Sequence, residues 1–224
     1  MKKKNLQNLR SLNNLEHEVE ETYLLIQALE TQAFTTKEFL ELIKAKDRPG
    51  YKEFKKFLEI SDKQINKLNE LGFIALFANF ECFVFELLKD LFKKYPTSFK
   101  SEKIAKFEDI KDFKNIKEVK DFFIDSLAIE KSYDIERWAN LLLQKFGIAI
   151  FKKKKELSLL LALNSLRNII MHSGSKTTSK FRKEMKSFIK VPVPIGKPFK
   201  PDMKKYFTTL YNILRTLIKN IKKS

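Results

Sequence analysis

The sequence predicts an all-α protein, an antiparallel helical bundle with a proline-rich extended loop before its last helix. Glycine and proline are scarce, with 5 and 6 residues among 224, which disfavours turn-rich β architectures. Apolar residues recur at helical spacing in several long runs, and 43% of the chain is hydrophobic. We therefore expect a single folded domain over residues 1–224.

The N-terminal residues 1–48 are predicted to form two helices that are accessory to the bundle. Apolar residues at positions 6, 9, 12, 19, 23 and 26 mark a first, amphipathic helix with an acidic outer side. The segment "TTKEFLELIKA" (35–45) is interpreted as a short second helix with Thr35 or Thr36 as its N-cap. The motif "RPGY" (48–51) then interrupts the chain.

A long central helix is predicted next. Ser61 and Gln64 match a capping box at its start, and Pro96 ends it after about Lys94. Residues 73–92 are apolar almost all round, which is typical of a helix at the centre of a bundle.

Shorter charged amphipathic pieces are predicted over residues 98–134. A further helix begins at Asp134, with Trp138 in the core. The second strongly apolar helix covers residues 151–172, and Gly174 is placed as the C′ residue that ends it.

The segment 190–202 contains four of the six prolines and cannot be helical. We expect an exposed extended arm or a loose hairpin there. Residues 203–223 form the final amphipathic helix.

The charge balance makes an anionic partner the leading expectation. Lys and Arg outnumber Asp and Glu by 45 to 28, and the net charge is +17. Nucleic acid, an acidic protein or an anionic membrane surface all fit this excess. The bias towards Lys over Arg is also what an AT-rich genome encodes, but that bias does not explain the excess of positive charge.

Targeting and membrane signals are not expected in this chain. The start, "MKKKNLQNLRSLNN", has no apolar core after its lysines, unlike a signal peptide. The apolar runs are interrupted before about 18 residues and are interpreted as buried helices. We therefore expect a cytoplasmic protein that does not span a membrane.

Several familiar chemistries lack their motifs. The sequence has no Gly-rich phosphate loop, no G-x-S-x-G elbow and no H-E-x-x-H pair. With 2 His and 1 Cys, a histidine-based metal site is not expected, and an enzyme of this kind would use neither metal nor organic cofactor. We expect Cys82 to be a buried structural thiol.

One stretch carries residues suited to phosphodiester chemistry: "LNSLRNIIMHSGSK" (163–176). Arg167 is a permanent cation suited to phosphate, and His172 is an acid/base group in the last helical turn. Asn168 and His172 lie four residues apart, so they share a helix face and can form a hydrogen bond. Cleavage of RNA by its own 2′-hydroxyl needs a base, a cation and an acid. Because one histidine cannot easily be both the base and the acid, this scheme works better if two copies of the chain meet at a dimer interface. On spacing alone, however, a histidine and a glycine at a helix end are favoured simply as caps.

The motif R-N-x3-H in "LRNIIMHSG" resembles the R-x4–6-H signature of HEPN domains. The run "IALFANFECFVFELLKDLF" is similar to the helix that packs against the motif helix in several HEPN families, with Glu81 at an acidic position often seen there. The resemblance extends over roughly residues 60–220, of which the short motif is the specific part. Tyrosine two residues after the histidine, which some HEPN toxins carry as an adenylylation target, is replaced here by Gly174.

The resemblance implies a helical bundle that dimerises so that two motifs face each other in a basic cleft. Many members are metal-independent ribonucleases of toxin–antitoxin, abortive-infection or CRISPR-associated defence, and others are inactive modules that bind RNA or proteins. Carried over by position, Arg167 binds the scissile phosphate, His172 is the acid/base and Asn168 orients them. Glu81 and Ser173 are supporting candidates. Candidate RNA-binding residues are Lys152, Lys153, Lys154, Lys155 and Lys176.

Three functions remain open from the sequence. The first is a dimeric HEPN-type endoribonuclease that makes 2′,3′-cyclic phosphate ends as a toxin or anti-phage effector, with RNA and an antitoxin or defence protein as partners. The second is an inactive HEPN module that binds RNA or a partner protein. The third is a helical protein whose basic surface binds an acidic partner other than RNA.

Overall fold

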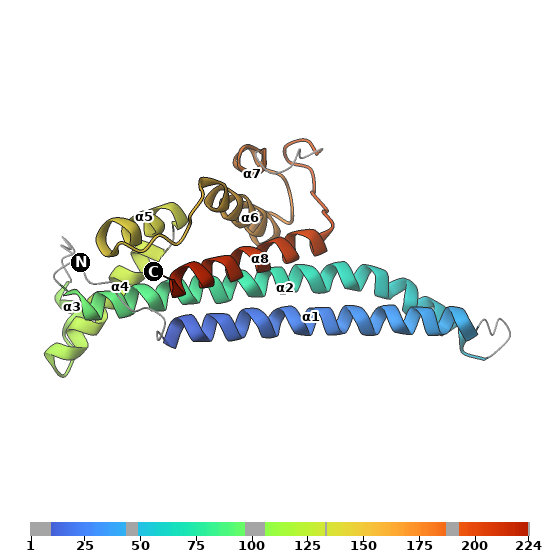
Figure 1. The fold of residues 1–224 in the computed structure, drawn as a ribbon, viewed down its shortest axis with the longest axis horizontal. Coiled ribbons are helices and arrows are strands. Elements are labelled where there is room, and N and C mark those ends of the chain that lie inside the picture. Colours follow the sequence, from blue (N-terminus) through green and yellow to red (C-terminus); the bar gives the residue numbers. More distant parts are fainter. Residues whose placement is uncertain (1–9, 44–48, 97–105, 133, 187–192, 224) are drawn as a thin grey trace. The chain divides into compact units, whose positions relative to one another are not determined.

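The computed structural model describes residues 10–43, 49–96, 106–132, 134–186 and 193–223 (Figure 1). Over these ranges it contains eight helices and one isolated β-bridge, Lys176 with Pro198. The all-α prediction is therefore confirmed for these residues. The helices are α1 (Arg10–Ile43), α2 (Tyr51–Lys94), α3 (Phe107–Ile110), α4 (Ile116–Ser132), α5 (Ile135–Phe146), α6 (Lys154–His172), α7 (Ser179–Met185) and α8 (Met203–Lys222).

The N-terminal region contains one long helix, so the prediction of two helices is wrong. Helix α1 runs without a break from Arg10 to Ile43 and contains Thr36 in its interior. The Thr36 hydroxyl donates a hydrogen bond to the Gln32 carbonyl at 2.8 Å, which lets the helix continue instead of starting anew. The apolar positions 6 and 9 lie outside the described residues.

The start of α2 also differs from the prediction. It begins at Tyr51, directly after Gly50, whose φ of +91° is readily adopted only by glycine. Ser61 lies inside the helix and does not begin it, and no glycine or proline stands between Gly50 and Ser61 to interrupt the helix. The predicted end is correct: α2 stops at Lys94, just before Pro96.

The chain divides into two compact units, which share the long helices. One consists of Met1–Leu15, Phe80–Leu157 and Leu217–Ser224, and we call it the first unit. The second unit consists of Glu16–Asn79 and Ser158–Thr216. Each is described by itself.

The first unit is organised around aromatic residues. Trp138 is 1% exposed, as predicted, and its ring lies 5.7 Å from that of Phe80. Helix α5 begins directly after its N-cap residue Asp134, whose side chain accepts a hydrogen bond from the Arg137 N–H at 3.0 Å. The end of α8 is joined to the segment between α5 and α6 by Asn220, whose side-chain amide donates a hydrogen bond to the Ile150 carbonyl at 3.0 Å.

Salt bridges join α2 and α4 within the first unit. Lys89 lies 3.1 Å from Asp125, and Lys93 lies 3.4 Å from Asp121. Burial by itself would lower the pKa of Lys89, but the hydrogen bond and charge of Asp125, with smaller contributions from Glu86 and Asp121, raise it.

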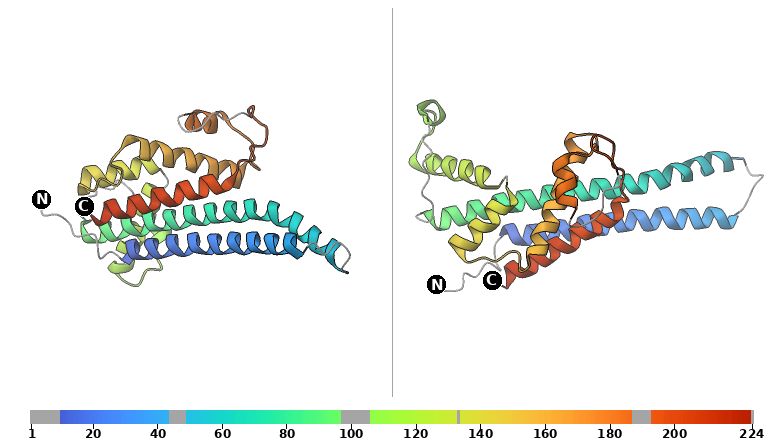
Figure 2. Two further views of the ribbon diagram at one scale, coloured as in Figure 1. Left: turned by 45° about the vertical axis from the view of Figure 1, so that its right-hand side comes forward. Right: turned by 90° about the horizontal axis from the view of Figure 1, so that it is seen from above.

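The second unit packs α1, α2 and α8 side by side (Figures 1 and 2). The rings of Tyr23 and Tyr211 stack with centroids 3.8 Å apart, which joins α1 to α8. Gly72 allows the close approach of both helices to α2, because a Cβ there would lie 2.8 Å from Ile26 and 2.9 Å from Phe207. The buried carboxylate of Glu30 accepts hydrogen bonds from Asn69 at 2.5 Å and from Lys204 at 2.7 Å.

The residues between α6 and α8 contain a helix that the sequence reading missed. Helix α7 begins after Thr178, whose hydroxyl accepts a hydrogen bond from the Phe181 N–H at 3.1 Å. The described part of the proline-rich segment is attached to the chain before α7. Backbone hydrogen bonds join Thr177 to Lys197 (3.0 Å) and to Gly196 (2.8 Å), and Phe199 to Ser175 (2.8 Å). Residues 190–192 lie outside the described residues.

One described helical stretch, Gln64–Lys94, is long and apolar enough to cross a membrane. Half of its most apolar window is buried inside the structure, and the core helix of a soluble protein passes the same criterion. The stretch is therefore weak evidence for a membrane span.

Candidate functional site

The motif helix α6 presents a buried face and a polar edge near its end. Leu163, Leu166 and Ile169 are at most 3% exposed, and their spacing of three residues places them on one side of the helix. Arg167 and Asn168 are half-buried at the margin of this face, whereas His172 is exposed in the last turn. The three predicted residues therefore lie within about one and a half turns of a single helix.

Arg167 and Asn168 interact directly. The Arg167 Nη1 atom donates a hydrogen bond to Asn168 Oδ1 at 3.1 Å. A guanidinium has five N–H donors, so this bond uses one of them and restrains the plane of the group. The contact therefore restrains the orientation of the arginine side chain.

The hydrogen bond that the spacing of Asn168 and His172 allows is not formed in the described part of the chain. Asn168 instead offers its side-chain oxygen to Arg167. His172 is solvent-exposed, so its imidazole can reach a ligand or a second chain without displacing a buried contact.

A tight turn ends α6 directly after His172. Gly174 has a φ of +53°, which confirms it as the residue that ends the helix. Ser175 follows with a φ of +61°, a conformation that costs a non-glycine residue energy. The Ser175 N–H donates to the Ile169 carbonyl at 2.8 Å, and the Lys176 N–H donates to the Ser173 carbonyl at 3.0 Å. Ser173 therefore takes part in this turn through its backbone.

The lysine run at the other end of α6 is solvent-exposed. The side chain of Glu156 caps the helix, because it accepts hydrogen bonds from the backbone N–H groups of Lys152 at 3.0 Å and Lys153 at 3.4 Å. The exposed members of the run are Lys152, Lys153, Lys154 and Lys155. They belong to the first unit, whereas Arg167, His172 and the exposed Lys176 belong to the second.

Two residues of α2 were singled out from the sequence. Glu81 is exposed and belongs to the first unit. Cys82 is exposed as well, so the expectation of a buried thiol is wrong. The reason is geometric: the buried positions Phe80, Phe83 and Val84 occupy one side of α2, and positions 81 and 82 fall on the other.

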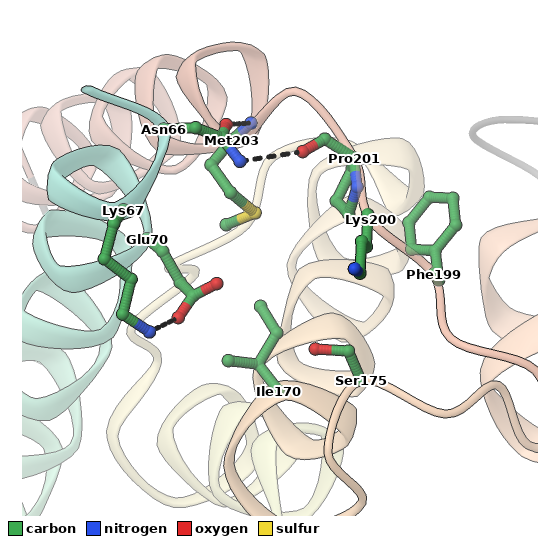
Figure 3. Close-up of a pocket in the computed structure, with 9 residues that line it drawn as sticks. All are labelled: Asn66, Lys67, Glu70, Ile170, Ser175, Phe199, Lys200, Pro201 and Met203. Carbon is green, nitrogen blue, oxygen red and sulfur yellow. Dashed lines mark hydrogen bonds and ion pairs between the residues drawn. The ribbon is translucent and has the colours of Figure 1, made fainter. Parts of the chain in front are cut away.

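A pocket of about 600 Å³ opens beside the end of α6 (Figure 3). Ile170 and Ser175 line it from α6 and the turn, and Lys200 lines it from the segment before α8. Asn66 lines the pocket from α2 and joins α2 to the start of α8, because its amide oxygen accepts a hydrogen bond from the Met203 N–H at 2.8 Å. Its other lining residues are Lys67, Glu70, Phe199, Pro201 and Met203. Lys67 and Glu70 form an ion pair at its edge.

Apart from Lys176, the cations that follow the motif were not singled out from the sequence. Between positions 175 and 200, the described residues carry seven Lys or Arg and one acid, Glu184. The order Thr178, then "SKFRKEM", was the available signal, since a threonine N-cap before a short amphipathic run predicts a helix.

Over the part of the chain that the structure describes, no group of three or more His, Cys, Asp or Glu residues is arranged to hold a metal ion. In comparisons with known proteins, no family model, curated protein or solved structure matches this chain.

Proposed function

We propose that the protein is a metal-independent endoribonuclease of the HEPN type that cleaves single-stranded RNA to 2′,3′-cyclic phosphate ends. It acts as a cytoplasmic homodimer, and its biological role is that of a toxin or an anti-phage defence effector. The observation that carries this proposal is the arrangement at the end of α6, where Arg167 is fixed by Asn168 and His172 is exposed in the last turn.

These residues match the steps of RNA cleavage. The guanidinium of Arg167 is a permanent cation whose planar N–H groups suit the non-bridging oxygens of a phosphate, whose negative charge increases in the transition state. His172 removes the 2′-hydroxyl proton or protonates the leaving 5′-oxygen. Since one imidazole cannot easily do both in one turnover, the second histidine comes from a second copy of the chain.

The remaining predicted residues have supporting roles in this proposal. Lys152–Lys155 and Lys176 bind RNA phosphates outside the cleavage point, where exposed lysines contribute salt-dependent affinity. Ser173 forms part of the turn after His172. Glu81 supports the motif from α2, and an antitoxin or another defence-system protein restrains the activity.

A growth assay tests the proposal in cells. Inducible expression of the wild-type chain should arrest growth of a bacterial host, and Arg167→Ala or His172→Ala should each relieve the arrest. Met171→Ala is the matched control, since Met171 is 49% exposed beside His172 and has no role in the chemistry. Equal toxicity of the wild type and both motif variants would reject a ribonuclease that uses these residues.

The alternative is an inactive HEPN module that binds RNA or a partner protein. The observation that favours it is that, among the described residues, Asn168 forms a hydrogen bond with Arg167 and none with His172, so Asn168 does not orient the imidazole within one chain. This reading expects salt-sensitive RNA binding without cleavage and harmless expression.

A further inference from the structure

The residues that follow the motif form a small lobe with its own core. We use the name basic lobe for residues 174–186 and 193–200. Inside it, Phe181 and Met185 are fully buried, and the Phe181 ring lies 5.5 Å from that of Phe199. Thr177 is 2% exposed and donates its hydroxyl to the Pro194 carbonyl. The lobe therefore presents its surface residues from a fixed backbone.

The charge on this lobe is almost entirely of one sign. Its only acid is Glu184, and all seven of its cations have exposed side chains: Lys176, Lys180, Arg182, Lys183, Lys186, Lys197 and Lys200. In the described part of the chain, none of the seven forms a salt bridge with a carboxylate. Ordinary solvated surfaces intersperse both signs, so this concentration of unneutralised charge points to a polyanionic ligand.

The position of the lobe relates it to the motif. It starts two residues after His172, and its turn residues are attached to α6 by the hydrogen bond from Ser175 to Ile169. The pocket beside the end of α6 shares Ser175, Phe199 and Lys200 with the lobe (Figure 3). The lobe therefore adjoins both this pocket and the end of the motif helix.

We propose that the basic lobe is the main surface for the phosphate backbone of single-stranded RNA, and that it contributes more phosphate contacts than the lysine run at Lys152–Lys155. This inference rests on the proposed function for the identity of the nucleic acid. Cations from both sides of the lobe take part: Lys180, Arg182 and Lys183 on α7, and Lys197 and Lys200 on the segment before α8. The contact between the buried rings of Phe181 and Phe199 joins α7 to the segment before α8.

Salt dependence of binding tests the lobe directly. The full chain carrying His172→Ala, which removes turnover, is titrated with a labelled single-stranded RNA of mixed sequence at several salt concentrations. Three further versions of this chain each lose three positive charges. The lobe version carries Lys180→Gln, Arg182→Gln and Lys183→Gln; the run version carries Lys152→Gln, Lys153→Gln and Lys155→Gln; the control carries Lys117→Gln, Lys120→Gln and Lys145→Gln.

For the lobe version, the slope of log affinity against log salt concentration should be smaller in magnitude by about 2. Each lost phosphate contact on a single strand reduces this magnitude by about 0.7. The control should keep the parental slope, and the run version should lose less than the lobe version. A lobe version that binds with the slope of the control, or a larger loss in the run version, would overturn the proposal.

A second variant distinguishes the loss of positive charge from a folding defect in α7. Lys197→Gln with Lys200→Gln leaves α7 intact and should reduce the slope by about 1.4. Circular dichroism and thermal melting should match the parent for both lobe versions. If the lobe versions bind normally while His172→Ala still abolishes cleavage, the lobe proposal fails and the ribonuclease proposal stands. If the lobe versions lose binding while the wild type never cleaves, the reverse holds.

Discussion

The Arg167 guanidinium donates a hydrogen bond to the side-chain oxygen of its sequence neighbour Asn168 at 3.1 Å. Neighbouring positions on a helix diverge by about 100°, so this contact requires the long arginine side chain to bend back along the helix surface. The contact thereby holds the arginine on the same edge of α6 as His172. In the sequence, His172 follows Asn168 by four residues and Arg167 by five. In the proposed ribonuclease, this contact predicts a positioning role for Asn168.

Replacing Asn168 should therefore reduce cleavage without removing it. Asn168→Ala should lower the cleavage rate by roughly 10- to 100-fold, because a misplaced phosphate-binding group costs about this much even when it is still present. Asn168→Asp, which keeps the acceptor oxygen, should recover part of the loss. Asn164→Ala, one turn earlier on α6 and also half-buried, is the control and should leave the rate unchanged. An Asn168→Ala enzyme as active as the control would remove the positioning role.

Gly72 is expected to be essential for the packing of the second unit. A Cβ at this position would meet the buried side chains of Ile26 and Phe207 at 2.8 and 2.9 Å. Gly72→Ala should lower the free energy of unfolding by about 1–2 kcal/mol, since overpacking outweighs the better helix propensity of alanine. Urea denaturation measures this change. The neighbouring Leu71→Ala, at a side chain that is 51% exposed, should change it by less than about 0.5 kcal/mol. A stabilised Gly72→Ala protein would contradict this packing.

The buried Glu30 carboxylate provides a second stability test. Asn69 is fully buried and donates to Glu30 at 2.5 Å, whereas the Lys204 side chain that also contacts Glu30 is 58% exposed. Asn69→Ala should cost about 1–3 kcal/mol, because it removes a buried donor from a buried charge. Lys204→Ala should cost less than about 1 kcal/mol, as exposed ion pairs generally do. Chemical denaturation that ranks Lys204→Ala as the more damaging change would contradict this assignment.

Tyr211 should make stability sensitive to alkaline pH. Burial raises the pKa of Tyr211 above 10.0, and its hydrogen bond to the Glu20 carboxylate at 2.7 Å raises it further. Because the folded protein holds this proton more tightly than the unfolded chain, the resulting stability is complete below about pH 10 and is lost as pH rises through the folded pKa.

The measurement is the free energy of unfolding between about pH 9 and 11, in wild type and Tyr211→Phe. The wild type should lose stability more steeply, and the variant should retain only the contribution of Tyr206 and Lys89, whose pKa values are also raised. Parallel pH profiles for the two proteins would show that Tyr211 is not responsible.

Much of the fold could be predicted from local patterns. The helix starts at Asp134 and the ends at Lys94 and Gly174 follow from single residues whose conformations or side chains cap or stop a helix. The predicted core position of Trp138 followed from apolar periodicity alone.

The errors arose where a local signal had two physical solutions. Thr36 can cap a helix or bond its hydroxyl to the carbonyl four residues earlier, and the second occurs. Ser61 matched a capping box, but nothing before it after Gly50 breaks a helix. The pairing of Thr177 with Gly196 and Lys197 joins segments about twenty positions apart, which periodicity does not reveal. The basic lobe was missed for this reason.

At the candidate site, the positions of Arg167, Asn168 and His172 at one helix end could be predicted from the sequence. The hydrogen bonds between their side chains could not. Spacing favoured a bond from Asn168 to His172, whereas the structure joins Asn168 to Arg167. Arg167 and His172 are both within reach of the Asn168 amide. Which of them it bonds depends on side-chain rotamers that the sequence does not specify.

RNA cleavage by the purified chain in EDTA tests the central claim most directly. The wild type should cleave single-stranded RNA and leave 2′,3′-cyclic phosphate ends, while Arg167→Ala and His172→Ala should each lower the rate by roughly 100- to 10,000-fold. Met171→Ala should cleave like the wild type. Undiminished cleavage by both motif variants, or no cleavage by a folded wild type over a range of RNA sequences, would contradict the account.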